Sequence, residues 1–506
     1  MRNGQYVAVS KRKKPREHLL GKPPGLMHRI GLAVAEDDNS LPEYYVGREY
    51  YVDRALDRRD PATFFMGPKG VGKSAILQMV RFLKANERQR LVEIAPDDLA
   101  FSSLANVTAT TPIMKEAEKN QFLFKCLWDY VLVLDLLRRE QGNEQGLLST
   151  LKALFKGKPN KEAQRLLKAS ISDDGSPQSM TARVLALISE VELSGPGGVG
   201  GKVVLGPGQV EKGGQLALLA QLNHVAKELP GTLRHPYYVI IDDLDLHWTD
   251  GAVQNALIAA LFTSIRKLSR TDNLKFVVAL RDDIFNRLPI EDRDKTHDRI
   301  CRVRWDAPTL KAMIRKRVSY ALKCSENDVW SEVLPRGAFD QMRQHTRGMP
   351  RELVRLTAIA LEIAQSEGHG AVYEQDVNAA IIRFSQERLA DLDERRHVYR
   401  GLPALMLRFR GHPKQFPVQD FVDLVQGAVS EVIARVPATH SYSWIGGYAD
   451  DLLSVAKVLL ECGVLQVKMS RTDRPRDWDP EDPIPLSSGT WLAIHPMYAP
   501  ALAGPA

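Results

Sequence analysis

A glycine-rich segment near the start of the chain has the spacing of a phosphate-binding loop. Residues 64–78 read FFMGPKGVGKSAILQ, in which Gly67 and Gly72 bracket four residues and are followed by Lys73 and Ser74. Glycine is required because the backbone amides must wrap around phosphates, and a Cβ would block those backbone angles. Lys73 is placed to reach the β- and γ-phosphates, and the Ser74 hydroxyl to ligate Mg²⁺. The spacing therefore predicts a nucleoside triphosphate site with a divalent metal.

The residues around this segment support the same interpretation. TFFM, which ends at Met66, has the composition of a buried strand, and SAILQMVRFLKA, which begins at Ser74, has the apolar period of a helix. The phosphates would then lie at a helix N-terminus, where free amides and the helix dipole favour anions. The residues predicted to contact the nucleotide are Gly67, Pro68, Lys69, Gly70, Val71, Gly72, Lys73, Ser74 and Ala75.

Two aspartates follow a second apolar run, YYVIIDDLD, at residues 237–245. A strand next to the loop strand would bring Asp242 close to Ser74, where it could hold Mg²⁺ directly or through water. Asp243 would then face the γ-phosphate and orient the attacking water. The alternative is an acidic strand end that faces solvent.

Two arginines are candidates for contact with the terminal phosphate. Arg281 ends the apolar run LKFVVAL, at the edge of the sheet where open α/β folds bind ligands; the alternative is an ion pair with Asp282 or Asp283. In TRGMPRELVRL, either Arg347 or Arg351 could reach the nucleotide from a helical domain, or could cap or pair locally. An arginine that releases its domain when the γ-phosphate is lost would act as a switch.

The elements that must position these residues alternate along the chain. Apolar strand-like runs at 90–96, 237–245 and 274–283 alternate with helical patterns, which predicts an α/β fold with a parallel sheet covered on both faces. The domains expected are a basic N-terminal arm (1–42), a P-loop core (43–300) with a helical insertion and Gly-rich connector at about 141–235, a helical lid (301–395) and a winged-helix-like domain (396–506).

A second glycine-rich segment does not have the chemistry of the first. Residues 195–214 contain nine glycines, but Pro196 occupies the position of the leading glycine and Val203 that of the Ser/Thr after Lys202. We interpret it as a flexible connector or a glycine-flanked hairpin.

The composition is that of a water-soluble protein, at 44% hydrophobic and 26% charged residues. No apolar run approaches the roughly 18 residues needed to span a bilayer, and the N-terminus lacks the apolar stretch of a secretory signal. We therefore expect a cytoplasmic protein with no membrane contact. Four cysteines without a C-x-x-C pair predict reduced thiols rather than a structural zinc site.

The basic charge lies at the N-terminus. Residues 1–30 carry eight Lys or Arg and one Glu, which accounts for the whole net charge of +7, so the rest of the chain is neutral. Residues 11–16, KRKKPR, could contact nucleic acid, or could be a solvated tail.

The order of these parts resembles the AAA+ and STAND P-loop ATPases. The motifs are YYVGRE, GPKGVGKS, IIDDLD, VVALRDD and TRGMPRE, and the resemblance covers about residues 43–390. It is similar to the origin-recognition-like and KAP-like branches and to bacterial stand-alone ATPases linked to phage defence. The resemblance implies ATP and Mg²⁺ as cofactors, Gly47 and Arg48 near the adenine, Asp243 in the place of the catalytic acid, and Arg281 and Arg351 as sensors.

Two positions depart from the motor-type AAA+ pattern. Motor proteins usually have Glu where this chain has Asp243, and often an uncharged polar sensor where it has Arg281. Both departures are more typical of STAND switches. A carboxylate that is one methylene shorter would place the water less well, so we expect slow turnover.

The C-terminal region has the order helix, turn, strand, loop, strand, which resembles a winged helix. Its expected wing, residues 471–490, carries three arginines and five acidic residues. An acidic wing is a poor phosphate contact, so protein docking is favoured over duplex binding.

Three functions follow from these features. The first is an ATP-dependent switch in bacterial defence or stress signalling, which forms a homo-oligomer or controls a separately encoded effector. The second is a DNA-handling ATPase that uses residues 11–16 and the winged domain. The third is an adaptor in which ATP is structural. The sequence favours the first.

Overall fold

The computed structural model describes residues 30, 34–94, 122–141, 214–244, 251–269, 272–290, 293–392, 399–479, 482 and 484–503. The chain divides into two compact units. Residues 45–304 form what we call the sheet unit, and residues 1–44 together with 305–506 form the helical unit. The sheet unit is therefore inserted, in sequence, into the helical unit.

A five-stranded parallel sheet lies at the centre of the sheet unit. Its order is β2-β3-β4-β1-β5, and every observed strand pair is parallel. The strands are β1 (Phe64–Met66), β2 (Leu91–Ile94), β3 (Tyr237–Ile241), β4 (Leu274–Leu280) and β5 (Ile300–Arg302). All residues of β3 and β4 are buried, as expected for a sheet covered on both faces. The predicted α/β class is confirmed.

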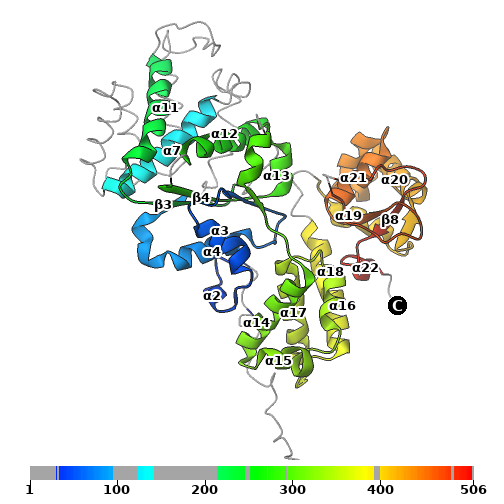
Figure 1. Cartoon of the computed structure of the whole chain (residues 1–506). Helices are drawn as coiled ribbons and strands as arrows, with labels where there is room; N and C mark the ends of the chain where they lie inside the picture. Colours follow the sequence, from blue (N-terminus) through cyan, green and yellow to red (C-terminus); the bar gives the residue numbers. More distant parts are fainter. Residues whose placement is uncertain are drawn as a thin grey trace, which may run out of the picture. The chain divides into compact units, whose positions relative to one another are not determined.

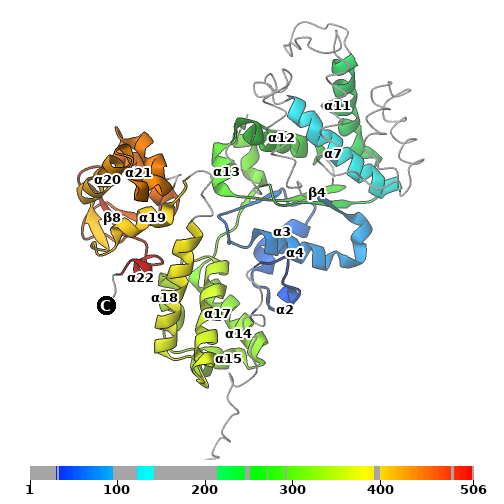
Figure 2. The same cartoon turned by 180° about the vertical axis from the view of Figure 1, so that it is seen from behind.

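Helices cover the two faces of this sheet (Figures 1 and 2). On one side are α7 (Phe122–Gln141), α11 (Gly214–Thr232) and α12 (Ala252–Leu268); on the other are η1 (Arg48–Val52), α3 (Asp53–Leu56) and α4 (Lys73–Leu83). The Phe64 ring of β1 stacks on Phe262 of α12 with 3.8 Å between centroids. Trp128 of α7 donates its indole N–H to the carbonyl of Leu257, at 2.8 Å. The first contact fixes β1 against α12, and the second joins α7 to α12 within the helical layer.

The strand order corrects one expectation. We expected the strand before Asp242 to lie next to the loop strand, but β4 lies between β1 and β3. The strand β5 was not predicted at all. Both results depend on pairing between distant segments, which local apolar patterns do not encode.

A buried lysine fixes the entry to β1. Lys275 of β4 is 3% exposed, and its ammonium donates to the carbonyls of Asp60 (2.7 Å) and Ala62 (2.8 Å). Burial lowers the pKa of Lys275 to about 8. The loop that leads into β1 is thereby attached to the neighbouring strand.

The described residues of the sheet unit also form the short elements η2 (Ala85–Arg90), α13 (Asp282–Arg287) and η3 (Arg293–Arg299). Cys126, Cys301, Cys324 and Cys462 form no disulfide with one another.

The first part of the helical unit is a helical bundle. It consists of α14 (Ala307–Leu322), α15 (Glu326–Asp328), η4 (Val329–Val333), α16 (Ala338–Gln344), α17 (Pro350–Ser366) and α18 (Glu374–Asp391). Asp306 caps α14 by accepting from the Thr309 N–H at 2.7 Å, and Pro350 is the first residue of α17, a position that suits proline because its missing N–H would have no partner there.

The end of the N-terminal segment packs on this bundle. Arg317 of α14 donates to the carbonyl of Ile30 (3.0 Å) and pairs with Asp38 (3.2 Å). Its guanidinium lies 4.5 Å from the ring centroid of Tyr44, whose hydroxyl also bonds Asp38. Tyr44 ends α2 (Leu41–Tyr44), so the expected arm boundary at residue 42 falls inside a helix. We call this set of contacts the Arg317 latch.

The C-terminal part of the helical unit contains a three-stranded antiparallel sheet of order β6-β8-β7. Along the chain the elements are α19 (Leu402–Met406), η6 (Leu407–Phe409), β6 (Gln415–Pro417), α20 (Val418–Ile433), η7 (Pro437–Tyr448), α21 (Leu452–Glu461), β7 (Leu465–Lys468), β8 (Trp491–Ile494) and α22 (Ala499–Leu502). This is the order of a winged helix, with the wing between β7 and β8. The strand β6 was not predicted.

Two sequence features lie outside the described residues, namely the basic segment 11–16 and most of the glycine-rich segment 195–214. Within the described part of the chain, no helix combines the length and the apolar character needed to cross a bilayer.

Candidate functional site

The glycine-rich segment forms a loop between β1 and α4. Gly72 has a φ of 100°, a left-handed conformation that favours glycine, and it is the N-cap of α4. Lys73 is the first helical residue, so the amides of the first turn are directed into the loop. A Cβ on Gly67 would lie 2.8 Å from Cγ1 of Val71 and 3.2 Å from the carbonyl oxygen of Val303. The loop therefore has the free amides, the helix dipole and the tight backbone that phosphate binding needs.

Lys73 is held across the mouth of this loop. Its ammonium donates to the carbonyls of Gly67 (2.9 Å) and Pro68 (3.1 Å). The positive charge thus lies over the same backbone that would surround a phosphate chain. Pro68 and Lys69 are exposed, Gly70, Ser74 and Ala75 are partly buried, and Val71 is buried.

The two aspartates follow β3 directly and differ in environment. Asp242 is 8% exposed, and its carboxylate accepts the Asp243 N–H at 3.1 Å. Its own N–H donates to the carbonyl of Ile94 at 3.4 Å, in continuation of the β2–β3 pairing. Asp243 is exposed and has a φ of 57°, an uncommon backbone conformation for a residue with a side chain.

The strand register places these acids at the level of the loop. Ile241 pairs with Val278 and Met66 pairs with Leu280, so continuing the register puts Asp243 level with Met66 across β4. Neighbouring strands are about 4.8 Å apart, so β1 and β3 are separated by about 10 Å. Because β4 fills the space between these strands, a metal ion with its water ligands would lie beyond the carboxyl end of β4, between Ser74 and Asp242. The donor set, one hydroxyl and one carboxylate beside a phosphate loop, suits Mg²⁺.

Two Arg–Asp pairs lie at the same edge of the sheet. Arg281, the N-cap of α13, bonds Asp283 with Nε–Oδ1 at 2.9 Å and Nη2–Oδ2 at 2.5 Å. Arg302 of β5 pairs with Asp282 at 3.0 Å. The ion pair considered as the alternative for Arg281 is thus formed with Asp283. Contact between Arg281 and a phosphate would require it to exchange this partner.

The other predicted contacts belong to different parts of the chain. Gly47 is buried with a φ of 88°, and Arg48 begins the π-helix η1, so both lie in the sheet unit, where η1 packs against α4, the helix that follows the phosphate loop. Arg351 lies in the first turn of α17, in the helical unit. Its sensor role stays a prediction.

Arg347 has a structural role in the helical unit. It bonds Glu352 through Nε (2.8 Å) and Nη2 (2.6 Å), and its backbone N–H donates to the same carboxylate at 2.7 Å. Burial opposes the charge on Arg347, but Glu352 outweighs it and raises the pKa of the guanidinium. A Cβ on Gly463 would lie 3.3 Å from the Arg347 side chain, so this arginine packs against the winged domain.

Sequence reasoning missed two residues that the structure brings out. Arg317 interrupts the buried stripe of α14, Leu310, Met313, Ile314, Val318 and Ala321, at a core position. A charged residue at a core position of a helix indicates that a residue of opposite charge is buried beside it, and this signal was present in the sequence. Tyr51 bonds Arg304, and no local pattern indicated it.

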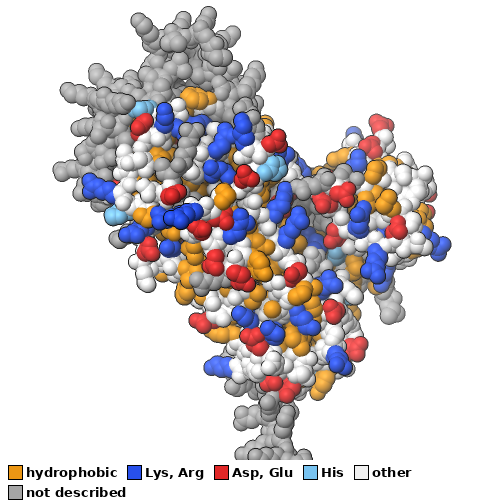
Figure 3. Space-filling model, viewed as in Figure 1, with side chains coloured by type: hydrophobic (Ala, Val, Ile, Leu, Met, Phe, Trp, Pro, Cys, Tyr) orange, Lys and Arg blue, Asp and Glu red, His pale blue; other side chains and the backbone are white. Residues whose placement is uncertain are grey.

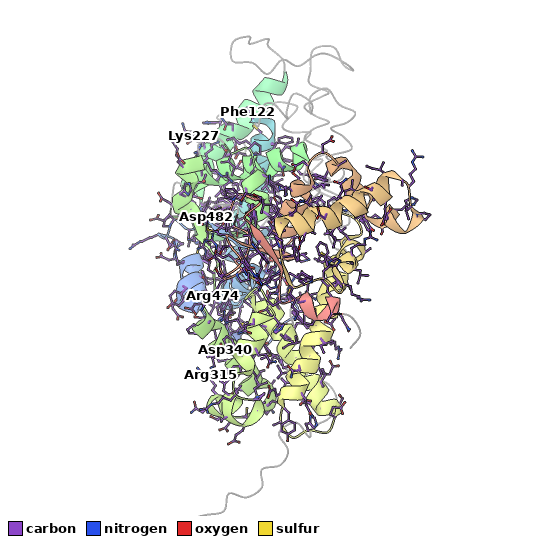
Figure 4. The ribbon with its side chains drawn as sticks, turned by 90° about the vertical axis from the view of Figure 1, so that its right-hand side faces the viewer. Phe122, Lys227, Arg315, Asp340, Arg474 and Asp482 are labelled. Carbon is purple, nitrogen blue, oxygen red and sulfur yellow. The ribbon has the colours of Figure 1, made fainter. Side chains whose placement is uncertain are left out.

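The winged domain has few of the exposed basic residues that contact with a DNA duplex requires. In α21, at the position of a recognition helix, Lys457 and Glu461 are the exposed residues, and the rest of the helix is partly or fully buried. The wing combines Arg474 and Arg476 with Asp477 and Asp482; Figure 4 labels Arg474 and Asp482. Figure 3 shows basic and acidic side chains interspersed on one face of the molecule.

Comparisons with known proteins bear on the helical bundle and on the whole chain. Residues 308–393, which span α14 to α18, match the model of the FunZ-associated C-terminal helical domain. No curated protein matches the chain.

Among solved structures, the chain is similar to the Aeropyrum pernix ORC1 protein in complex with DNA, at 12% identity and a TM-score of 0.42, covering 93% of this chain and 96% of that one. The Aeropyrum pernix ORC2 protein in ADPNP–ADP complexes matches at 13% identity and a TM-score of 0.39, covering 91% and 94%. Drosophila ORC bound to DNA matches at 11% identity and a TM-score of 0.35, covering 99% and 96%. The family model accounts for the helical bundle alone.

Proposed function

We propose that this chain binds Mg·ATP and hydrolyses it slowly, as a switch that couples nucleotide state to oligomerisation or to a partner protein. The observation that carries the proposal is the loop from Gly67 to Ser74, with the Lys73 ammonium held over it and Asp242 at the same edge of the sheet. Phosphate at a helix N-terminus is stabilised by amides and by the dipole, and Lys73 neutralises its charge.

Each residue then has a role. The amides of residues 67–75 hold the phosphates, Ser74 and Asp242 hold Mg²⁺, and Gly47 and Arg48 contact the adenine. Asp243 orients the water that attacks the γ-phosphorus as the bond to the β-phosphate oxygen breaks, which gives ADP and inorganic phosphate. Arg281 exchanges Asp283 for the γ-phosphate, and Arg351 reaches the nucleotide from the helical unit.

A switch suits this architecture better than a motor. Two compact units are joined at residues 44–45 and 304–305, so a ligand that favours one relative pose shifts the population of poses. The catalytic position holds the shorter Asp243, which agrees with slow turnover. We place the activity in bacterial defence or stress signalling, with a homo-oligomer and a separately encoded effector as partners.

DNA handling is the second candidate, favoured by the winged-helix order and by the KRKKPR segment at residues 11–16. The mixed charge of the wing and the largely buried α21 oppose it. Duplex binding that weakens steeply with salt and is lost on deletion of residues 1–29 would support this candidate. Ile30 is kept in that deletion because its carbonyl belongs to the Arg317 latch.

The test is calorimetric titration of Mg·ATP into the full chain, with light scattering and phosphate release measured on the same samples. Lys73→Ala should weaken binding at least about 100-fold, equivalent to about 2.7 kcal/mol, and abolish any ATP-dependent change in mass. The matched control is Lys227→Ala, which removes an exposed lysine from α11 (Figure 4). Absence of binding heat in the unaltered chain would refute nucleotide binding, and full biological activity of Lys73→Ala would favour an adaptor.

A further inference from the structure

The point where the chain leaves the sheet unit lies against the phosphate loop. After β5, the Val303 N–H donates to the carbonyl of Met66 at 2.7 Å. The carbonyl oxygen of Val303 is so close to Gly67 that a Cβ there would be 3.2 Å away. Any movement of the loop backbone at Gly67 therefore displaces residues 303–304, which lead directly to Trp305 of the helical unit.

A tyrosine also contacts the segment through which the chain leaves the sheet unit. The Tyr51 hydroxyl donates to the Arg304 carbonyl at 2.6 Å and accepts the Arg304 N–H at 2.9 Å. One phenol thus satisfies both backbone groups of the last residue of the sheet unit, since a hydroxyl both donates and accepts. Tyr51 belongs to η1, a short π-helix, and such elements are frequent at functional sites.

The second connection between the units leads into η1, the element that carries Tyr51. The chain passes from the helical unit to the sheet unit between Tyr44 and Tyr45, and then runs through Gly47 into η1. Both connections are therefore attached to segments that the proposed function places around the nucleotide: the phosphate loop for one, and Gly47 with Arg48 for the other.

We infer that Tyr51 is a positioning residue that transmits nucleotide occupancy to the orientation of the helical unit. Its hydroxyl joins the segment after β5, at Arg304, to the segment after Gly47. A shift of the backbone at the phosphates or at the adenine would therefore move both connections between the units together. Without the hydroxyl, residues 303–304 are attached to the phosphate loop only through the contacts of Val303. The inference rests on the proposed function, because it needs nucleotide in the loop.

The experiment uses the full chain with one fluorophore on each unit. Cysteines are introduced by Lys227→Cys in α11 and Asp340→Cys in α16, both exposed and both labelled in Figure 4, with Cys324→Ser to remove the one native thiol that is not buried. Energy transfer between the dyes is followed during titration with Mg·ATP, and affinity is measured separately by calorimetry. Thermal unfolding confirms that each variant is folded.

Tyr51→Phe should retain Mg·ATP affinity within about fivefold, the low end of allosteric coupling, and lose at least half of the nucleotide-dependent change in transfer. The matched control is Tyr50→Phe, the same change at a neighbouring ring that is 62% exposed, which should keep the full response. An unchanged response in Tyr51→Phe, or no response in the unaltered chain despite binding, would overturn the inference. Absence of binding in the unaltered chain would instead refute the proposed function beneath it.

Discussion

At the scale of single residues, the conformation of Asp243 explains why an aspartate suits this position. Its φ of 57° is costly for most residues, but Asp and Asn visit the left-handed region because their short polar side chains bond locally. The exposed carboxylate sits one residue beyond the buried Asp242. Longer side chains lack this compensation, so the backbone favours Asp over Glu at this position.

This leads to a prediction for Asp243→Asn. Asparagine tolerates the same backbone, so the free energy of unfolding should change by less than about 0.5 kcal/mol. Loss of the carboxylate should slow ATP hydrolysis by about 10² to 10⁴, the usual contribution of general acid–base catalysis. Thermal unfolding and single-turnover phosphate release measure the two effects. Hydrolysis at the unaltered rate would remove Asp243 from the catalytic role.

The candidate site could be predicted from the sequence only where its chemistry is local. Gly67 to Ser74 are contiguous, so their spacing alone indicated the loop, and the structure shows that loop in the predicted strand–helix context. Arg281 remained ambiguous because its choice between Asp283 and a phosphate depends on tertiary placement. Tyr51 and Arg304 are distant in sequence, and nothing in either segment points to the other.

At the scale of elements, the long or continuously apolar segments were predictable and the shortest were not. The runs at 237–245 and 274–283 contain β3 and β4, and the helical patterns contain α7 and α12. The strands β5 and β6 have three residues each, too few to show a period. The position of β4 between β1 and β3 is a property of pairing, not of any one segment.

The Arg317 latch gives a prediction at this scale. Arg317 is 8% exposed and Asp38 4%. Arg317→Met should leave the Asp38 charge buried without its cation and destabilise the helical unit by about 3 kcal/mol. Urea unfolding measures the loss, and proteolysis within residues 34–44 should become faster.

A second arginine on the same helix is the control. Arg315 of α14, labelled in Figure 4, pairs with Glu326 at 2.9 Å, with the two side chains 39% and 41% exposed. Because surface ion pairs contribute at most about 1 kcal/mol, Arg315→Met should have a small effect. Equal losses for the two variants would show that the latch adds nothing beyond a surface pair.

At the scale of the whole molecule, the helical unit has a buried histidine between its bundle and its winged domain. His495 is 2% exposed and accepts the Met497 N–H at its Nδ1 (3.0 Å), while its Nε2 lies 3.6 Å from Asp477. Burial lowers the pKa of His495; Asp477 and Glu352 oppose this effect, and Arg347 and His345 add to it.

Acid should therefore weaken this junction. The folded state favours the neutral ring, so its contribution to stability is complete above the ordinary pKa of about 6.5 and is lost as pH falls through the lower folded value. His495→Asn retains an acceptor for the Met497 N–H but cannot titrate. Between about pH 7 and pH 5 the unaltered chain should lose more unfolding free energy than this variant, by about 1.4 kcal/mol for each unit of pKa depression. His412→Asn, at an exposed position, should lose as much as the unaltered chain.

The insertion of the sheet unit between residues 44 and 305 has a consequence for biosynthesis. As the chain emerges from the ribosome, Asp38 and Tyr44 appear long before Arg317, the residue that holds them. The sheet unit can complete its folding while these N-terminal residues wait for α14. Truncations that remove residues 38–44 therefore act on a unit whose other residues, from 305 onward, are synthesised only after the sheet unit.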